Sequence, residues 1–152
     1  MKSTNRARGQ RPMLVTDFDF ALPDPEAAVC AVLENPVGCA PLAELARGRR
    51  GACILICDIT RPVPNHLFLR PLIEGMLAAG MPRDGITVLV ATGLHRPNEG
   101  AELAEVVGDP WVLDAVKVEN HFARDAAAHV DLGVTSARRT PCAPWVGLSA
   151  AT

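Results

Sequence analysis

The sequence predicts an α/β fold in which a parallel, Rossmann-like sheet is flanked by helices. Apolar segments of strand length occur at residues 52–57, 86–91 and 115–118, and segments with helical spacing lie between them. This alternation is the βαβ pattern, whose right-handed crossovers make the strands parallel. The chain of 152 residues is long enough for one domain with a substantial core.

The first of these strands is a continuous apolar run, residues 52–57, that stops at a polar cluster. Such a run is typical of a strand that is buried on both faces. Residues 86–91 are rich in β-branched side chains and predict a second buried strand. Residues 13–16 and 130–134 are candidates for two further short strands.

Capping residues and apolar spacing predict the helices. They are expected from Pro25 to Asn35, from Pro41 to about Gly48, from Leu67 to Gly80, and from about Asn98 to Gly108. Asp24 is suited to cap the first of them, with Pro25 at its first position. Pro71 either kinks the third helix or lies in its first turn, and the sequence leaves both readings open.

The composition is that of an ordinary globular protein, with 49% hydrophobic and 21% charged residues. The net charge of −2 gives no electrostatic reason to expect nucleic acid or an anionic membrane as a partner. With four Phe, two Trp and no Tyr, a base-stacking surface is not expected either. No apolar stretch reaches membrane-spanning length.

The cysteines and the start of the chain indicate a reducing compartment. The five cysteines contain no CxxC pair and are expected to be buried, reduced thiols: Cys30, Cys39, Cys53, Cys57 and Cys142. The basic first twelve residues are expected to be disordered and lack the apolar segment of a signal peptide. The expected location is therefore cytoplasmic.

Polar residues follow the first strand directly, as Asp58-Ile59-Thr60-Arg61. Because ligands bind at the carboxyl ends of parallel strands, this segment is a candidate binding site. Arg61 offers a two-pronged donor for a carboxylate or phosphate. The alternative is an ion pair between Asp58 and Arg61, with Thr60 capping the next helix.

A second candidate segment follows the second strand, as Thr92-Gly93-Leu94-His95-Arg96. Its histidine can act as an acid or base near neutral pH, and its glycine lets a ligand approach the backbone. The alternative is a turn glycine beside a hydrogen-bonded loop histidine. Arg61 and His95 are expected to line one crevice, with Asn120 and His121 nearby.

Other sites are not expected. His121 and His129 are eight residues apart with no third ligand in the pattern, so we predict no metal ligands. No GxGxxG or P-loop motif and no nucleophile motif occurs.

Three stretches together carry a resemblance to a known family. They are Asp58-Ile-Thr-Arg-Pro-Val-Pro-Asn65, Ala91-Thr-Gly-Leu-His-Arg-Pro97 and Asn120-His121. In these stretches the chain resembles the N-terminal domain of the lactate racemase family, over roughly residues 22–135. The resemblance implies an incomplete N-terminal domain of a two-domain fold, over residues 13–135.

The resemblance also implies roles for individual residues. Asp58, Ile59, Thr60 and Arg61 correspond to a segment that binds a nickel-pincer nucleotide cofactor, and Arg61 would also hold the carboxylate of a 2-hydroxy acid. His95 corresponds to one of two histidines that exchange a proton with the substrate hydroxyl. A base near the hydroxyl and a hydride acceptor are both needed for this chemistry.

The end of the chain departs from the family. Nothing after Thr135 corresponds to the second acid/base histidine, the lysine that tethers the cofactor or the histidine that binds nickel. Residues 136–152 are therefore expected to be an atypical tail, from a truncated or frame-shifted gene. We expect the chain not to racemise a 2-hydroxy acid by itself.

Three functions remain open from the sequence. The first is the cofactor- and substrate-binding portion of a lactate-racemase-like isomerase. The second is a non-catalytic remnant or binding module that keeps the fold. The third is half of a split enzyme whose partner chain supplies the missing domain.

Overall fold

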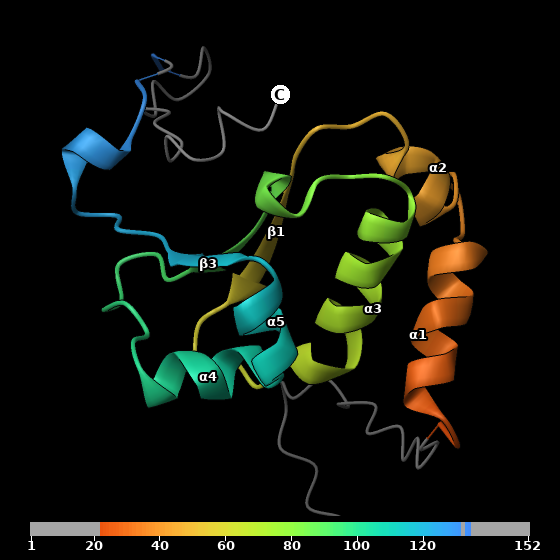
Figure 1. The fold of residues 1–152 in the computed structure, drawn as a ribbon. Helices are drawn as coiled ribbons and strands as arrows, with labels where there is room; N and C mark the ends of the chain where they lie inside the picture. The colour runs from red at the N-terminus through yellow and green to blue at the C-terminus, as the bar shows by residue number, and fades with distance from the viewer. Residues whose placement is uncertain (1–21, 132, 135–152) are drawn as a thin grey trace, which may run out of the picture.

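Three parallel strands form the sheet of this protein. In the computed structural model, which describes residues 22–131, 133 and 134, they are β1 (Ala52–Cys57), β2 (Ile86–Ala91) and β3 (Lys117–Asn120), in the order β1-β2-β3 (Figure 1). Cys57 pairs with Ala91, and Val90 pairs with Asn120. The predicted parallel α/β fold is confirmed, although β3 begins two residues later than expected because Ala115 ends the preceding helix.

The described helices are α1 (Pro25–Glu34), α2 (Leu42–Ala46), α3 (Asn65–Ala78), α4 (Ala101–Val107) and α5 (Pro110–Ala115), with 3₁₀ turns at Arg83–Gly85 and Ala126–Ala128. Asp24 caps α1 as predicted, because its Oδ1 accepts a bond from the Ala27 amide at 2.9 Å. The helix α5 was not predicted, although Asp109 caps it in the same way.

The starts of α3 and α4 differ from the expectation by two or three residues. The third helix starts at Asn65, so Pro71 lies inside α3 and not in its first turn. The helix α4 starts at Ala101, three residues after the expected Asn98. It ends as predicted at Gly108, whose φ of 73° is the left-handed conformation that glycine adopts without strain.

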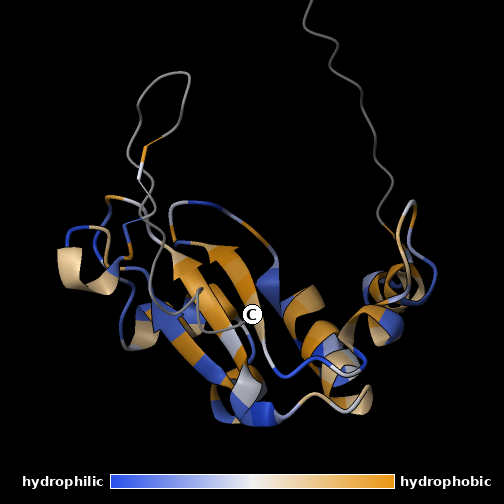
Figure 2. Cartoon of the chain, turned by 90° about the horizontal axis from the view of Figure 1, so that it is seen from above, coloured by the Kyte–Doolittle hydropathy of each residue, from blue (hydrophilic) through white to orange (hydrophobic). Residues whose placement is uncertain are grey.

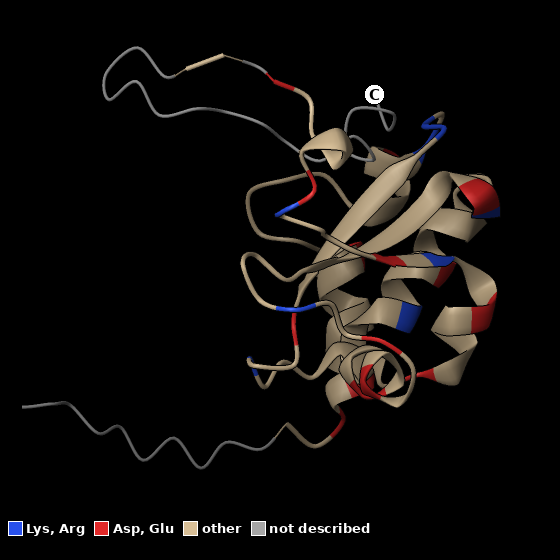
Figure 3. Cartoon of the chain, turned by 90° about the vertical axis from the view of Figure 1, so that its left-hand side faces the viewer, with Lys and Arg blue, Asp and Glu red and all other residues tan. Residues whose placement is uncertain are grey.

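The hydrophobic core lies between one face of the sheet and the helices. The residues that fill it come from β1, β2, α3, α4 and α5 and include Ile54, Ile56, Ile86, Val88, Val90, Leu69, Ile73, Val107 and Val112. Leu69 and Ile73 of α3 are 0% exposed, so α3 is the helix that seals this face. Figure 2 shows β1 and β2 as largely hydrophobic strands, whereas the short strand β3 is mostly hydrophilic. Acidic and basic residues are interspersed over the helices (Figure 3).

The other face of β1 is not covered by the described part of the chain. Leu55 is 58% exposed and Cys57 is exposed, so the prediction that this strand is buried on both faces is wrong for β1. The reason is that no described helix packs on this face of β1, so only its alternate residues Ala52, Ile54 and Ile56 contact the core. The central strand β2 meets the prediction better, since Leu89 and Val90 are both buried.

The cysteines follow from this arrangement. Cys30, Cys39 and Cys57 are exposed, so the prediction of buried thiols is wrong for these three. Cys53 is half-buried, and burial, followed by the nearby Glu119 carboxylate, raises the pKa of its thiol. Cys142 lies outside the described residues.

Several expectations fall at the ends of the chain. The proposed start at residues 1–12, the strand at 13–16 and the tail at 136–152 all lie outside the described residues. Among the described residues of the segment 130–134, only a single-residue bridge at Val134 occurs, so the strand predicted there is wrong. Of the helices in the described ranges, none is long and apolar enough to cross a membrane.

Candidate active site at the carboxyl ends of the strands

Three loops meet at one edge of the sheet, because the parallel strands all end there. The loop after β1 begins with Asp58, the loop after β2 with Thr92, and the loop after β3 with His121. His95 Nδ1 bonds the Asp58 carboxylate at 2.5 Å, and Thr92 Oγ1 donates to the carbonyl of His121 at 2.5 Å. The predicted convergence of the three strand ends is confirmed.

Asp58 is the buried anchor of this edge, with 5% of its surface exposed. Its Oδ1 accepts from the Thr60 hydroxyl at 2.5 Å and from the Thr60 amide at 3.1 Å, and its Oδ2 faces His95. These bonds from Thr60 and then from His95 lower the pKa of the Asp58 carboxyl, against the effect of burial. Asp58 is therefore a carboxylate at neutral pH.

The alternative for residues 58–61, an ion pair between Asp58 and Arg61 with Thr60 as a helix cap, is not found among the described residues. Asp58 is bonded to Thr60 and His95, and no ion pair with Arg61 is present among the described contacts. Thr60 does not cap α3 either, since Pro64 occupies the cap position without a side-chain bond. Arg61 is consequently left without a side-chain partner in the described part of the chain.

One ring nitrogen of His95 is hydrogen-bonded, and the other side of the ring is exposed to solvent. Its side chain is 60% exposed, while Nδ1 is bonded to the Asp58 carboxylate. A carboxylate can only accept, so the neutral ring carries its proton on Nδ1 and presents the lone pair of Nε2. This pairing of an oriented imidazole with a buried carboxylate is the arrangement of a general acid/base.

Asp58→Asn is expected to destabilise the folded chain by about 1–2 kcal/mol at pH 7, because bonds to a charged acceptor are lost. Folding lowers the pKa of Asp58, so its stabilising effect is complete above the ordinary value and is lost as the pH falls through the lowered one. The difference between the two proteins should thus shrink below about pH 4. Urea unfolding at pH 7 and pH 3 measures it; a difference independent of pH would contradict the assignment.

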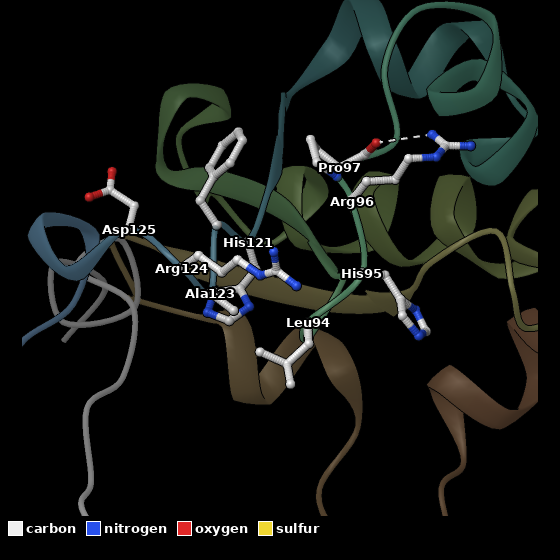
Figure 4. A pocket seen from close by; sticks show the side chains of 10 residues that line it. Leu94, His95, Arg96, Pro97, His121, Ala123, Arg124 and Asp125 are labelled. Atoms are coloured by element: carbon white, nitrogen blue, oxygen red, sulfur yellow. Dashed lines mark hydrogen bonds between the residues drawn. The ribbon is translucent and has the colours of Figure 1, made fainter.

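Two cavities lie at this edge of the sheet. His95 lines the larger one, of about 570 Å³, formed by residues 93–97 and 121–125 (Figure 4). Arg61 lines a second one, of about 250 Å³, together with Asp58, Ile59 and other residues of the loop after β1. Arg61 and His95 thus lie at the same edge but do not share one of these two cavities, and Asp58 connects them.

Two residues that the sequence analysis missed hold the loops in place. Asn98 is 1% exposed, and its Oδ1 accepts from the Ile59 amide at 3.3 Å. Its backbone N–H donates to Asn120 Oδ1 at 2.9 Å, and Asn120 Nδ2 donates back to the Asn98 carbonyl at 2.8 Å. Asn98 therefore ties the loops after β1 and β2 to the last residue of β3. Its position directly after Pro97, before the helix, was the available signal.

Glu102 is the second missed residue. Its two carboxylate oxygens accept hydrogen bonds from Nη1 and Nη2 of Arg96, at 2.6 and 2.8 Å. These bonds lower the pKa of Glu102. The pair joins the His95 loop to the first turn of α4. Arg96 thus has a structural partner, in contrast to Arg61.

The fold and this edge define a class of protein: an α/β domain whose carboxyl edge presents a histidine oriented by a buried carboxylate and, in a neighbouring cavity, an exposed arginine. The model of the lactate racemase N-terminal domain family matches residues 11–142. The chain belongs to the lactate racemase N-terminal domain family.

Individual relatives agree with this assignment. The chain is 37% identical over 101 residues to the lactate racemase of Lactiplantibacillus plantarum, and 33% identical over 101 residues to that of Thermoanaerobacterium thermosaccharolyticum. Each match covers 66% of this chain but only 23% and 22% of the relatives. The chain therefore spans about a quarter of the length of the curated relatives it matches.

Solved structures show the same fold. The lactate racemase apoprotein from Thermoanaerobacterium thermosaccharolyticum matches with a TM-score of 0.74 and 25% identity, over 84% of this chain and 30% of that chain. A protein from Thermotoga maritima matches with a TM-score of 0.56 and 17% identity, over 78% of this chain and 28% of that one. The second likeness concerns the fold alone.

Proposed function

We propose that this chain is the cofactor- and substrate-binding portion of a lactate-racemase-like isomerase that acts on a 2-hydroxy acid. The observation that supports it most is the Asp58–His95 pair at the carboxyl edge of a sheet of this family. The remainder of a racemase would complete the site, whether it lies on the same polypeptide or on another chain.

His95 is the proposed acid/base. To invert the configuration at C2 of a 2-hydroxy acid by this chemistry, the hydroxyl proton and the hydrogen on C2 are both removed and then both returned. The Nε2 lone pair of His95 would take the hydroxyl proton, and Asp58 would stabilise the imidazolium that forms. Asp58 acts here as a positioning residue, since it touches His95 and not the substrate.

Arg61 is the proposed anchor for the substrate carboxylate. Its guanidinium is exposed at the end of β1, and no partner for it occurs among the described residues. A guanidinium binds a carboxylate through two parallel bonds, which fixes the orientation of a small acid as well as its position.

Arg61→Lys is expected to weaken lactate binding by about tenfold. A lysine ammonium cannot form the two parallel bonds of a guanidinium, which stabilise the bound carboxylate by roughly 1–2 kcal/mol more than a single contact. The measurement is the concentration dependence of racemisation in the reconstituted enzyme. Arg96→Lys is the matched control, since Arg96 is engaged by Glu102 and is not proposed to bind the substrate. Equal affinities for wild type and Arg61→Lys would remove Arg61 from the site.

The segment of Asp58, Ile59, Thr60 and Arg61 fits a nucleotide cofactor of the kind this family is proposed to use, a nickel-pincer nucleotide. The amides of Ile59 and Thr60 already donate within the chain. Arg61 has five N–H donors, so beside the substrate carboxylate it can also donate to a phosphate of the cofactor. Ile59 is 36% exposed and offers an apolar contact for a ring. When bound, this cofactor supplies the acceptor for the substrate hydride.

Complementation tests the proposal. The 152-residue chain is mixed with mature nickel cofactor and the remainder of the Lactiplantibacillus plantarum lactate racemase, and D- and L-lactate are separated by chiral chromatography. We expect interconversion with both components and none with this chain alone. Absence of turnover in the mixture, with both components folded and cofactor bound, would contradict the proposal.

A further inference from the structure

The segment after β3 brings two histidines together. The chain leaves β3 at Asn120, passes through the 3₁₀ turn Ala126–Ala128 and returns, so that His129 faces His121. The two Nε2 atoms are 3.0 Å apart, and the rings meet edge to face, with centroids 5.2 Å apart and planes at 80°. Although the two histidines are eight residues apart in the sequence, their Nε2 atoms, which can act as metal ligands, are in contact.

The orientation of His129 is set by a second bond. Its Nδ1 lies 2.7 Å from the carbonyl oxygen of Asp125. A carbonyl can only accept, so Nδ1 carries the proton and Nε2 carries the lone pair that points at His121. Histidines that bind metal ions characteristically donate their other N–H to a backbone carbonyl in this way, which fixes the tautomer and the ring.

The spacing of the two nitrogens suits a shared ion. Nitrogen ligands lie about 2.0–2.1 Å from Zn²⁺, so two of them at angles between 90° and tetrahedral are roughly 2.9–3.4 Å apart. The observed 3.0 Å falls in this interval. It is also the length of an N–H···N bond, in which His121 would donate from Nε2. Moving that proton to His121 Nδ1, for which no bond occurs in the described chain, frees the second lone pair.

The surroundings favour the neutral rings that metal binding needs. Both side chains are half-buried, and burial disfavours the charged form of an imidazole. His121 also lines the cavity of about 570 Å³ that His95 lines, so solvent and small ligands can reach the remaining coordination positions (Figure 4).

We propose that His121 and His129 form a two-histidine site for a divalent first-row transition-metal ion. Both Nε2 atoms are ligands, and water or an oxygen of a small ligand in the cavity completes the coordination. Among the described residues no third His, Cys, Asp or Glu joins them, so the site is open on the side of the cavity. Imidazole ligands select Cu²⁺, Zn²⁺ and Ni²⁺ over Mg²⁺ and Ca²⁺. This ion is distinct from the nickel of the family's cofactor, and the site does not depend on the proposed function.

Isothermal titration of the metal-free 152-residue chain with Zn²⁺, Ni²⁺, Cu²⁺ and Mg²⁺ tests this at pH 7.5. We expect one Zn²⁺, Ni²⁺ or Cu²⁺ ion per chain, tightest for Cu²⁺, and no heat with Mg²⁺. His121→Gln and His129→Gln should each weaken binding at least tenfold. His66→Gln is the matched control: His66 is an exposed histidine at the start of α3, and its removal should leave the affinity unchanged.

A spectroscopic arm identifies the ligands. The electron paramagnetic resonance spectrum of bound Cu²⁺ should show hyperfine coupling to two nitrogen nuclei in the wild type and to one in each single variant. Circular dichroism confirms that the variants are folded. Absence of binding in the wild type, or binding that is unchanged in both variants, overturns the proposal and leaves the pair as a hydrogen bond.

Discussion

His95→Ala is expected to lower racemisation by the complemented enzyme by about 10²–10⁴-fold, the usual contribution of a general acid/base. The substrate hydroxyl would lose the only described group at this edge that combines an exposed ring nitrogen with an orienting carboxylate. Stability should fall by no more than about 1–2 kcal/mol, because one bond to the Asp58 carboxylate is lost while the side chain itself is 60% exposed. The measurement is the rate of D- to L-lactate conversion at saturating substrate.

Two further observations separate catalysis from structure in this variant. Added imidazole should restore part of the activity of His95→Ala, because it can occupy the space beside Asp58. His66→Ala, which removes an exposed histidine of α3, should keep full activity. Full activity of His95→Ala would show that a structural residue has been mistaken for a catalytic one.

Leu69→Ala is expected to destabilise the domain by about 2–5 kcal/mol, since the side chain is fully buried and its loss leaves a cavity. That is a large part of the stability of an ordinary domain. Leu69 lies in α3 at the centre of the core, between the helices and the sheet. Urea unfolding followed by circular dichroism gives the change in the free energy of unfolding.

Leu45→Ala is the control for Leu69→Ala. Leu45 also lies in a helix, α2, but is 52% exposed. Its truncation should cost less than about 1 kcal/mol, because little apolar surface returns to water. Equal losses at the two positions would mean that α3 does not seal the core as described.

The strands and their direction were predictable because local pattern decides them. The residue types of β1 and β2 mark strands in any context, and the helical spacing between them forces a parallel crossover. The exposure of Leu55 was not predictable, because an apolar run looks the same whether or not another layer covers its second face. The short helix α5 was missed because six residues carry too little periodicity to separate from a loop.

The site was predictable as a location and less so as a set of contacts. Strand ends carry Asp58, His95 and Asn120 to one edge, which follows from topology alone. That Asp58 would bond His95 and not the nearby Arg61 depends on loop geometry over 37 residues. Asn98 was expected at the start of a helix, whereas it lies three residues before α4 and bonds to the neighbouring loops. The contact between His121 and His129 depends on the 3₁₀ turn Ala126–Ala128, which no sequence motif predicts.

The reciprocal bonds between Asn98 and Asn120 have a consequence for the motion of the edge. Loop amides usually exchange with solvent deuterium quickly, because small local openings expose them. The amide of Asn98 is different: it donates to a buried side chain at the end of β3, and the amide of Ile59 donates in turn to Asn98. Opening the first requires the loop after β2 to move away from the end of β3, and opening the second requires the loop after β1 to move away from Asn98. Their protection should approach that of the strands themselves, so the loops around Asp58 and His95 keep one shape until the sheet itself opens.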